Sequence, residues 1–534
     1  MIDATEPDRL AAVRNEAPPG APPTLAVIDM GASAIRLVVA ESDPDGKVRI
    51  LEEAARGVLL GKDTFTHGRI MASTMKAAVR VLEGFRRIMD GYGVRRCRAV
   101  ATSAVREAAN RDTFLDRVRL RTGIEVEVID GSEENRLTYM AVREVLRDHE
   151  ILRTGNTLLV EIGGGSADIS FLRGGSPSLS GTYALGAIRM RQSLATWHGT
   201  HERRVRLLRR HIHNVVEDIK REMPLREATH FIALGGDVRF AASRLQGRED
   251  PDERVSFLGE PGFVAFCDQI ASDDVDDLVD KHRLPPADAE TLVPALLAYS
   301  ELLLATSAEE IAVPDVSLRD GLLLEMTREA DAQRLADFQR QVLSSAAALG
   351  ERYRFDAIHA GNVAQLAVRL FDELKAEHGL KPQDRLLLEV AALLHDAGIY
   401  LNRRAHHKHS QYILSVSDIF GLSSEDMAMV SNVARYHRRG LPQKSHLPYM
   451  TLDRDSRLRV NKLAALLRIA NALDADHLQK VKDLRVVRED DEWILEVDGA
   501  GDLTMERLAT LARSDLFIDV FGQKLTFREE FSRP

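Results

Sequence analysis

The feature that most constrains this chain is a strand, glycine turn and strand that occur twice. The first copy is LAVIDMGASAIRLVVAES at residues 25–42, and the second is TLLVEIGGGSADISFL at residues 157–172. In each copy an acid, Asp29 or Glu161, precedes an apolar residue, a glycine, small residues and a second apolar strand. Alternating apolar residues around such a turn indicate a β-hairpin. Two matched hairpins predict two similar α/β halves that face each other across a cleft.

Glycine-rich turns of this kind suit phosphate. Without Cβ atoms the backbone can approach a ligand closely, and successive N–H groups can converge on phosphate oxygens. A nearby carboxylate is suited to Mg²⁺ or to orienting a water, and such acids are Asp29, Glu161 and Asp168. Glycines at strand ends also serve tight packing, which is the alternative for either turn alone. The expected phosphate-binding turns contain Gly31, Ala32 and Ser33, and Gly163, Gly164, Gly165 and Ser166.

Size and charge exclude several classes of protein. A chain of 534 residues with 44% hydrophobic side chains predicts three or four folded domains. Two cysteines without metal spacing favour a reducing, cytoplasmic location, and we expect neither secretion nor membrane insertion. The net charge of −10, from 72 basic and 82 acidic residues, argues against general nucleic-acid binding but permits a local basic groove.

The pattern of apolar residues divides the chain into segments. Helical patterns at 73–90 and 132–146 alternate with short strands at 98–104 and 125–130. From about residue 331 the chain becomes strongly helical, and near residue 484 a hairpin begins, followed by a helix and a short strand. The predicted organisation is a flexible tail (1–23), two lobes (24–150 and 151–330), a helical domain (331–483) and a small α/β unit (484–534).

Five blocks carry a resemblance to a known family. They are ATSAVREAAN (101–110), VIDGSEENRL (128–137), EIGGGSADIS (161–170), LGAIRM (185–190) and SLRDGLLLE (317–325). Their order and spacing resemble the exopolyphosphatase and guanosine pentaphosphate phosphohydrolase family, a branch of the actin, sugar-kinase and acetate-kinase fold. The resemblance implies a two-lobed, actin-like (ribonuclease H-like) α/β phosphatase core. RYRFDAIHAGNVAQLA, LLHDAG, HHKHSQYIL and VFGQKLTF also resemble the all-α HD-like domain and the C-terminal unit of the family's long members.

The resemblance implies removal of a terminal phosphate from polyphosphate or a guanosine polyphosphate. Glu134 matches the catalytic glutamate, the base toward the attacking water. We expect Ser132 to cap the following helix, which places Glu133 and Glu134 in its first turn, where the macrodipole favours ionised carboxylates. Arg106 and Arg189 are expected to bind phosphate oxygens, or alternatively to form surface ion pairs, and Arg36 of the first hairpin is also expected to bind phosphate.

The sequence also departs from the family pattern. In DMGASAIR, small residues stand at Ala32 and Ala34, where polar phosphate contacts are expected. Glu161 and Asp168 exchange the usual Asp and Glu, and Asp237 in LGGDVRF stands where a hydroxyl is usual. These departures leave open a binding protein, a sensor of polyphosphate or guanosine polyphosphate with weakened catalysis.

The helical domain raises the question of a second site. His359, His395 and Asp396 resemble the metal ligands of HD phosphohydrolases, but Asn471 stands where the last Asp is expected, with Asp474 nearby. Non-catalytic work is favoured, namely extension of the binding groove and a homodimer interface, and a metal-dependent HD phosphohydrolase is the alternative. Further candidates for ligands or phosphate contacts are His406, His407, His409 and His437. The basic run around them could contact a long polyanion or form a solvated face.

These observations together predict an exopolyphosphatase-type phosphohydrolase. Water would attack the terminal phosphorus, Glu134 would activate it, and Mg²⁺ would be held by Asp29, Glu161 and Asp168 in some combination. Polyphosphate is the first choice of substrate, and guanosine pentaphosphate is the second.

Overall fold

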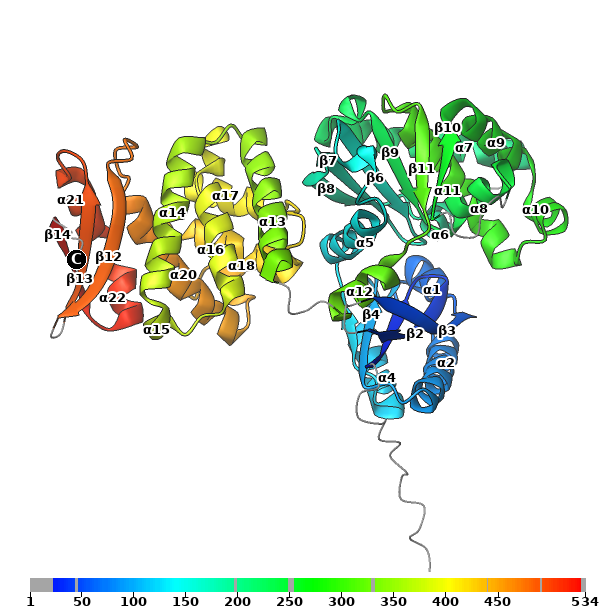
Figure 1. Ribbon diagram of the computed structural model, residues 1–534, viewed down its shortest axis with the longest axis horizontal. Helices are drawn as coiled ribbons and strands as arrows, with labels where there is room; N and C mark the ends of the chain where they lie inside the picture. The colour runs from blue at the N-terminus through cyan, green and yellow to red at the C-terminus, as the bar shows by residue number, and fades with distance from the viewer. Residues whose placement is uncertain are drawn as a thin grey trace, which may run out of the picture.

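The computed structural model describes residues 23–43, 47–195, 199–247, 254–327, 332–438, 440–489 and 492–529. Apart from Pro23, the predicted tail lies outside the described residues. The two lobes stack one above the other, and a mainly helical region lies beside them (Figure 1). Within the described part of the chain, no helix is long and apolar enough to cross a membrane.

The first lobe is built on a five-stranded sheet in the order β3-β2-β1-β4-β5. β1 pairs with β2 in antiparallel register and with β4 in parallel register, and β4 and β5 are also parallel. The buried faces of α1, α2, α3 and α4 share one hydrophobic core with this sheet. The bounds are β1 (Thr24–Met30), β2 (Ala34–Ser42), β3 (Val48–Gly57), α1 (Leu60–His67), α2 (Ala72–Gly91), β4 (Arg96–Ala101), α3 (Ser103–Arg106), α4 (Arg111–Thr122) and β5 (Val126–Val128).

The second lobe repeats the plan of the first. Its sheet has the order β10-β11-β9-β6-β7-β8, in which β8-β7-β6-β9-β11 reproduces the pairing directions of β3-β2-β1-β4-β5. The prediction of two similar α/β halves is confirmed. The bounds are β6 (Asn156–Ile162), β7 (Ala167–Arg173), β8 (Ser176–Tyr183), α6 (Ala187–Ala195), α7 (His201–Glu222), β9 (His230–Leu234), α8 (Gly236–Leu245), β10 (Val255–Gly259), α9 (Glu260–Ser272), α10 (Val275–His282), α11 (Pro286–Leu304) and β11 (Glu310–Pro314), with 3₁₀ turns η1 (Glu150–Leu152) and η2 (Leu225–Glu227).

Two helices join the lobes. α5 (Gly131–Val145) leaves the first lobe and packs its buried face on the second sheet, whereas α12 (Leu318–Thr327) returns from the second lobe onto β1. The helices touch at Gly321, where a Cβ atom would overlap with the backbone of Leu137. This contact fixes the start of α5, and therefore Glu134, relative to both sheets.

The capping of α5 differs from the prediction. Asp130 is the N-cap, and its Oδ1 accepts a hydrogen bond of 3.1 Å from the backbone N–H of Glu133. Ser132 lies one position inside the helix, so the expectation that it caps the helix is wrong. The cap moves because the helix begins earlier, at Gly131, directly after the extended backbone of Asp130. Glu133 and Glu134 still lie in the first turn, as expected.

The region after residue 331 is a helical bundle with a small sheet on one side. The sheet has the order β12-β13-β14, with β12 and β13 antiparallel and β14 parallel to β13. A single hydrophobic core includes both helical residues such as Leu467 and sheet residues such as Trp493 and Leu495. The bounds are α13 (Ala332–Arg352), α14 (Ala357–Glu373), α15 (Lys375–His378), α16 (Pro382–Leu394), η3 (Ala397–Tyr400), α17 (His406–Ser415), α18 (Ser424–Arg435), α19 (Leu447–Met450), α20 (Arg454–Ala472), β12 (Val481–Glu489), β13 (Glu492–Gly499), α21 (Thr504–Arg513), α22 (Asp515–Phe521) and β14 (Lys524–Glu529).

The helical region is tied to α5 beside the two lobes. The Oδ2 atom of Asp130 accepts a hydrogen bond of 2.6 Å from the backbone N–H of Ser424, at the start of α18. Tyr139 of α5 packs edge-on against Phe420, with 5.5 Å between ring centroids. One carboxylate therefore contacts the N-termini of two helices from different parts of the chain.

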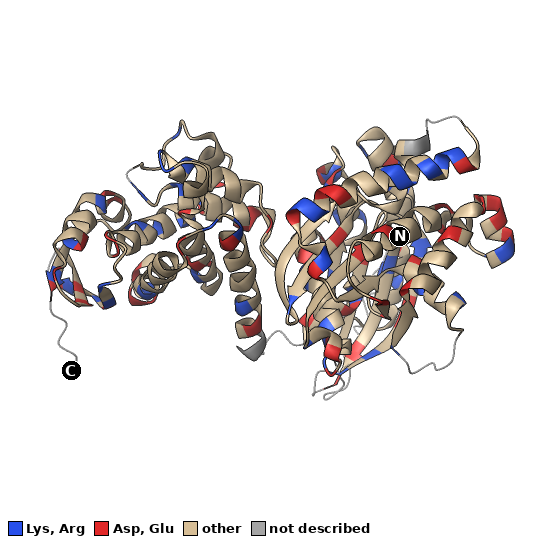
Figure 2. Cartoon of the chain, turned by 90° about the horizontal axis from the view of Figure 1, so that it is seen from above, with Lys and Arg blue, Asp and Glu red and all other residues tan. Residues whose placement is uncertain are grey.

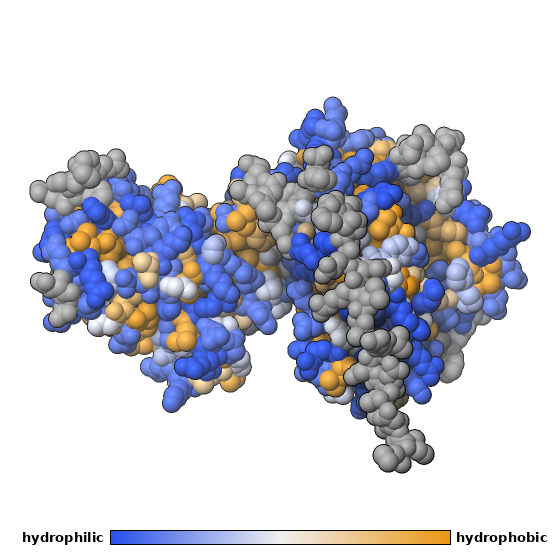
Figure 3. Space-filling view, turned by 60° about the horizontal axis from the view of Figure 1, so that its bottom comes forward, coloured by the Kyte–Doolittle hydropathy of each residue, from blue (hydrophilic) through white to orange (hydrophobic). Residues whose placement is uncertain are grey.

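The surface carries both signs of charge. Figure 2 shows basic and acidic residues interleaved along the ribbon of the lobes and of the helical region. On the face seen in Figure 3, hydrophobic residues form scattered patches among hydrophilic ones.

Candidate active site

A cavity of about 400 Å³ lies between the two hairpins. It takes residues from the β1–β2 turn, the β6–β7 turn, the β9–α8 turn and the starts of α5 and α12. Polar and small residues dominate this lining. They include Asp29, Gly31, Ala32, Ser33, Arg36, Thr102, Ser103, Glu134, Glu161, Gly163, Gly164, Ser166, Asp168, Gly235, Gly236, Asp237, Arg239 and Arg319.

The first hairpin places an acid opposite an arginine. Asp29 and Arg36 are direct partners in the β1–β2 register, and Arg36 Nη1 lies 3.8 Å from Asp29 Oδ2. A second arginine, Arg319 at the start of α12, lies 3.5 Å from the same oxygen. The sequence analysis did not select Arg319, although it lies in the SLRDG block that carried the resemblance. The carboxylate of Asp29 therefore has two arginines beside it in the cavity.

The second hairpin places two acids opposite each other. Glu161 and Asp168 are direct partners in the β6–β7 register. Thr138 donates to Glu161 over 3.0 Å, and Thr182 donates to Asp168 over 2.6 Å. Burial raises the pKa of both carboxyls, to about 7 for Asp168, and their mutual repulsion adds to the rise of Asp168. The cross-strand pairing of these two acids concentrates negative charge on this side of the cavity.

Glu134 lies in the first turn of α5 and lines the same cavity. Arg106, at the end of α3, donates from Nη1 to Glu134 Oε1 over 2.7 Å and to the carbonyl of Ile129 over 2.6 Å. Burial raises the pKa of Glu134 well above the usual carboxyl range, Asp168 adds to the rise, and Arg106 opposes it. The arginine therefore favours the ionised form that a base requires.

Two glycines of the second turn are needed for close packing. A Cβ at Gly164 would come within 2.8 Å of the Ala32 side chain and 2.9 Å of Ile188, and one at Gly165 would overlap with Phe65 and Ser103. None of the turn glycines of the two hairpins has a positive φ, so close approach rather than backbone conformation requires glycine at Gly164 and Gly165, whereas a Cβ at Gly31 or Gly163 would come no nearer than 3.5 Å to its neighbours. Among the described residues, the backbone N–H groups of Ser33 and Gly164 donate to no protein acceptor.

Three of the expected phosphate-binding residues, Gly165, Arg106 and Arg189, do not line the cavity, and Arg106 instead pairs with Glu134. Gly165 belongs to the second turn but is buried and does not reach the cavity. Arg189 donates through Nε to the carbonyl of Gly165 over 2.6 Å and pairs with Glu107 at 2.6 Å, with its guanidinium over the ring of Phe65. In this arrangement Arg189 holds the second turn in place from behind.

The third glycine turn brings another acid to the cavity. Gly235 has a φ of 123°, and the turn leads directly into α8, where Asp237 lies in the first turn. Burial and the neighbouring Asp288 raise the pKa of Asp237 to about 7, while Arg239 opposes the rise. The side of the cavity next to α8 therefore carries two carboxyl groups, Asp237 and Asp288, together with Arg239.

The three predicted metal ligands share the cavity but are not tightly clustered. Among the described residues, the groups of ligand atoms that all lie within 4.8 Å of one another are His359, Asp396 and His477, and Asp396, His406 and His437. Asp29, Glu161 and Asp168 do not form such a group. Their carboxylate oxygens suit a hard divalent cation, and the raised pKa values of Glu161 and Asp168 are what an uncompensated cation site would produce.

The helical region gathers most of the remaining predicted residues. His395, His437 and His359 are buried around Asp396, whereas His409 lies outside both ligand groups. His406 joins the cluster, and His477 is a member that the sequence analysis missed.

One expectation for this cluster is corrected. Asn471 was placed at the position of the missing acid, but the carboxylate that contacts the cluster is Asp474, whose Oδ2 atom lies 2.7 Å from His359 Nδ1. The register differs because α20 ends at Ala472 and the following turn directs the Asp474 side chain inward, fully buried.

Comparison with known families decides the class. The Ppx/GppA phosphatase family matches residues 38–330, and domain III of Ppx/GppA phosphatases matches residues 342–516. The chain belongs to the Ppx/GppA phosphatase family. The resemblance stated from the five blocks is thereby confirmed, and with it the expectation of a phosphohydrolase.

Individual relatives agree with this assignment. The chain is 25% identical over 463 residues to a guanosine-5'-triphosphate,3'-diphosphate pyrophosphatase of Vibrio parahaemolyticus, covering 84% of this chain and 87% of the relative. It is 24% identical to the protein of that name from Vibrio cholerae, covering 88% and 93%. In structure it is similar to an exopolyphosphatase from Cytophaga hutchinsonii, with a TM-score of 0.53 and 23% identity over 58% of this chain and 99% of that one. This last similarity supports the actin-like fold of the two lobes.

Proposed function

We propose that the cavity between the lobes hydrolyses the terminal phosphoric anhydride of a linear phosphate chain. The observation that carries the proposal is that Glu134, paired with Arg106, lines the same cavity as two opposed hairpin turns. The backbone N–H groups of Ser33 and Gly164 have no protein acceptor among the described residues and are suited to phosphate oxygens.

Glu134 is the proposed base. Its carboxylate would take a proton from a water that attacks the terminal phosphorus. The bond from that phosphorus to the bridging oxygen breaks, and the products are free phosphate and a substrate chain that is one phosphate shorter. Arg106 opposes the rise in the pKa of Glu134 and orients its carboxylate, and Arg36 and Arg319 lie where they would pair with phosphate oxygens once a substrate displaces Asp29 as their partner.

A divalent cation is part of this proposal. Asp29, Glu161 and Asp168 would hold it, and we infer Mg²⁺ because the donors are carboxylate oxygens. When bound, such an ion supplies positive charge to the phosphoryl oxygens. It would also offset the repulsion between Glu161 and Asp168 that their cross-strand pairing creates.

Inorganic polyphosphate is the proposed first substrate, and guanosine pentaphosphate is the second. The names of the relatives refer to both kinds of substrate. The Vibrio proteins are named guanosine-5'-triphosphate,3'-diphosphate pyrophosphatase, and the Cytophaga protein is named an exopolyphosphatase. Both substrates end in the same chemical group, so both remain compatible with Glu134 as the base.

One observation favours the alternative of a sensor. Ala32 is buried, and its side chain packs where a Gly164 Cβ would be, so it offers no polar contact to a ligand. The first hairpin would then bind phosphate through its backbone alone. A protein of this kind would bind the polymer without hydrolysing it at a comparable rate.

The test measures phosphate release and product length for long-chain polyphosphate and guanosine pentaphosphate, with Mg²⁺ present or removed by a chelator. The proposal predicts Mg²⁺-dependent release, with products that shorten from the end one phosphate at a time. Binding of either substrate without release would support the sensor instead. Release that persists with Glu134→Gln but disappears with Asp396→Asn would place the activity in the helical region, as the HD phosphohydrolase alternative requires.

A further inference from the structure

We propose that the helical region holds a divalent transition-metal centre organised by Asp396, separate from the cavity between the lobes. Asp396 is shared by two groups of side chains, one with His406 and His437 and the other with His359 and His477. Within each group the ligand atoms all lie within 4.8 Å of one another. The residues come from α14, from the ends of α16 and α18, from the start of α17 and from the turn after α20. Helices distant in sequence therefore converge on a single carboxylate.

The first group brings three electron-donating atoms together. His406 Nε2 lies 3.0 Å and His437 Nε2 3.4 Å from Asp396 Oδ1. The two Nε2 atoms lie 3.2 Å from each other. Such proximity requires something positive between or upon these atoms, either a proton or a metal ion.

The opposite nitrogen of each ring is held by a backbone carbonyl. His406 Nδ1 lies 3.0 Å from the carbonyl oxygen of Arg403, and His437 Nδ1 lies 2.6 Å from that of Ala434. Because a carbonyl only accepts, each Nδ1 carries the hydrogen, and the neutral ring then has a lone pair at Nε2. Two Nε2 lone pairs and a carboxylate oxygen therefore face one another. A single metal ion can accept all three of these donor atoms.

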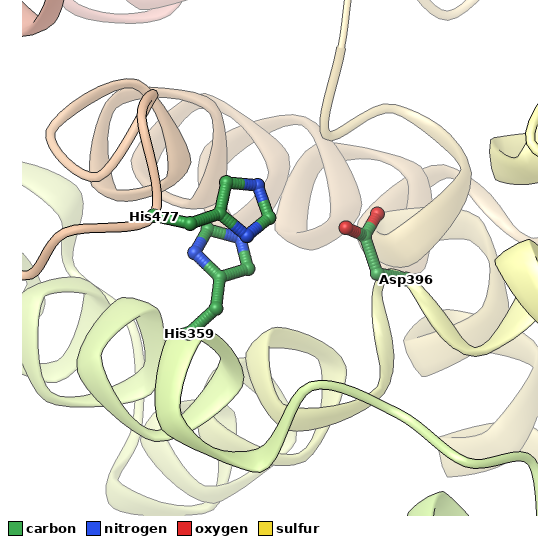
Figure 4. Close-up of side chains that lie close together, drawn as sticks. All are labelled: His359, Asp396 and His477. Atoms are coloured by element: carbon green, nitrogen blue, oxygen red, sulfur yellow. The ribbon is translucent and has the colours of Figure 1, made fainter.

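In the second group, one ring nitrogen of His359 is likewise held by a protein acceptor. His359 Nδ1 lies 2.7 Å from Asp474, whose carboxylate accepts the hydrogen and fixes the ring. His359 Nε2 has no hydrogen-bond partner among the described residues, although the side chain is 1% exposed. The ring of His477 stacks on that of His359 with 3.6 Å between ring centroids, and Figure 4 shows the two imidazoles together, across from Asp396.

His395 adds a further unpartnered nitrogen. Its Nδ1 lies 2.6 Å from the carbonyl of Ala392, while its Nε2, fully buried, has no hydrogen-bond partner among the described residues and lies 3.7 Å from Asp396 Oδ2. A buried polar atom left unsatisfied costs free energy unless a ligand completes it. Every buried histidine around Asp396 thus has one nitrogen fixed by the protein and the other available.

The donor set defines the class of metal. Imidazole nitrogens with one carboxylate suit Zn²⁺, Mn²⁺, Fe²⁺ or Co²⁺ rather than Mg²⁺ or Ca²⁺, which prefer oxygen ligands. Three protein ligands in a group leave a coordination position open for water or an anion. Asp396 and His477 are partly exposed, with side-chain accessibilities of 16% and 40%, which gives an ion a path to the site.

The test uses the full-length chain, depleted of metal with a chelator and dialysed against Zn²⁺ or Co²⁺. We expect about one to two equivalents of bound metal by mass spectrometry, and a visible Co²⁺ absorption band of the kind that His-containing sites produce. Asp396→Asn and His437→Gln should each lose at least half of the metal and most of the band. His409→Ala, on the same helix as His406 but outside both groups, should keep them, as should Glu134→Gln in the other cavity.

Two measurements separate loss of metal from loss of fold. Far-ultraviolet circular dichroism should be the same for Asp396→Asn and wild type, and added Zn²⁺ should raise the unfolding temperature of wild type and His409→Ala but not of Asp396→Asn. Wild-type protein that binds no metal above the level of a control without protein would overturn the proposal. Equal metal content in wild type and Asp396→Asn would overturn it as well.

Discussion

The Nη1 atom of Arg106 lies 2.7 Å from Oε1 of Glu134, so the proposed base on α5 is held by a cation at the end of α3. Burial raises the pKa of Glu134, and Arg106 opposes that rise. The carboxylate must be ionised to accept a proton, so activity falls as the pH drops through its pKa.

Arg106→Met should move this acidic limb to higher pH. Without the guanidinium the Glu134 pKa rises further, and the limb should shift by roughly one to three pH units, the range over which a neighbouring Arg lowers the pKa of an acid. The measurement is kcat/KM for phosphate release between pH 5 and 9. Arg106→Lys is the matched control, because it keeps the positive charge and should shift the limb less. An unchanged limb with Arg106→Met would show that Arg106 does not tune Glu134.

Gly165→Ala should destabilise the protein. The added Cβ would overlap with Phe65 and Ser103, which cannot move apart without separating the second hairpin from the first lobe. We expect a loss of about 1–3 kcal/mol in the free energy of unfolding, the usual effect of overpacking.

Gly84→Ala is the control for this substitution. Gly84 lies within α2 and has open space where a Cβ would be, so alanine there should stabilise by about 0.5–1 kcal/mol. If Gly165→Ala were as stable as wild type in denaturant titrations, the close contact between hairpin and lobe would be refuted.

Asp237→Asn should change the pH dependence of stability. The pKa of Asp237 is raised to about 7 in the fold, compared with about 3.9 in an unfolded chain. The folded state therefore binds this proton more tightly, and the stability that it contributes at low pH is lost as the pH rises through about 7. Asparagine does not titrate, so the variant should gain stability relative to wild type between pH 5 and pH 8, as measured by denaturant unfolding. Asp112→Asn, at a side chain that is 91% exposed, is the control, and an equal gain there would contradict the account.

Asp130→Ala should weaken two helix starts at once. Its carboxylate accepts from the N–H of Glu133 at the start of α5 and from that of Ser424 at the start of α18. Loss of a cap costs about 1–2 kcal/mol, and here the helical region would also lose a link to α5. Ser132→Ala should lie within about 0.5 kcal/mol of wild type, because Ser132 is not the cap. A larger loss for Ser132→Ala than for Asp130→Ala would restore the original prediction from sequence.

The two hairpins and the class of protein could be predicted from sequence because their signals are local. Alternation around a glycine turn identifies both hairpins, and the paired sheets confirm them. The cap of α5 was misplaced by two residues, from Asp130 to Ser132, because both residue types are good caps and only the backbone distinguishes them.

Contacts between distant segments could not be predicted in the same way. Arg319 reaches Asp29 across 290 positions, and Asp474 reaches His359 across 115. His477 was missed because no spacing pattern connects it to α14. The assignment of the helical region as HD-like and the homodimer stay predictions.

The most direct test of the account compares Glu134→Gln with Glu133→Gln. Both are in the first turn of α5, and Glu133 pairs with Arg136 rather than lining the cavity. The measurement is the single-turnover rate of phosphate release from polyphosphate, with binding of the polymer checked for each variant. The account predicts a loss of about 10²–10⁴-fold for Glu134→Gln, the usual contribution of a general base, with binding retained and with Glu133→Gln within about tenfold of wild type. Equal rates for Glu134→Gln and wild type would contradict the assignment of Glu134 as the base.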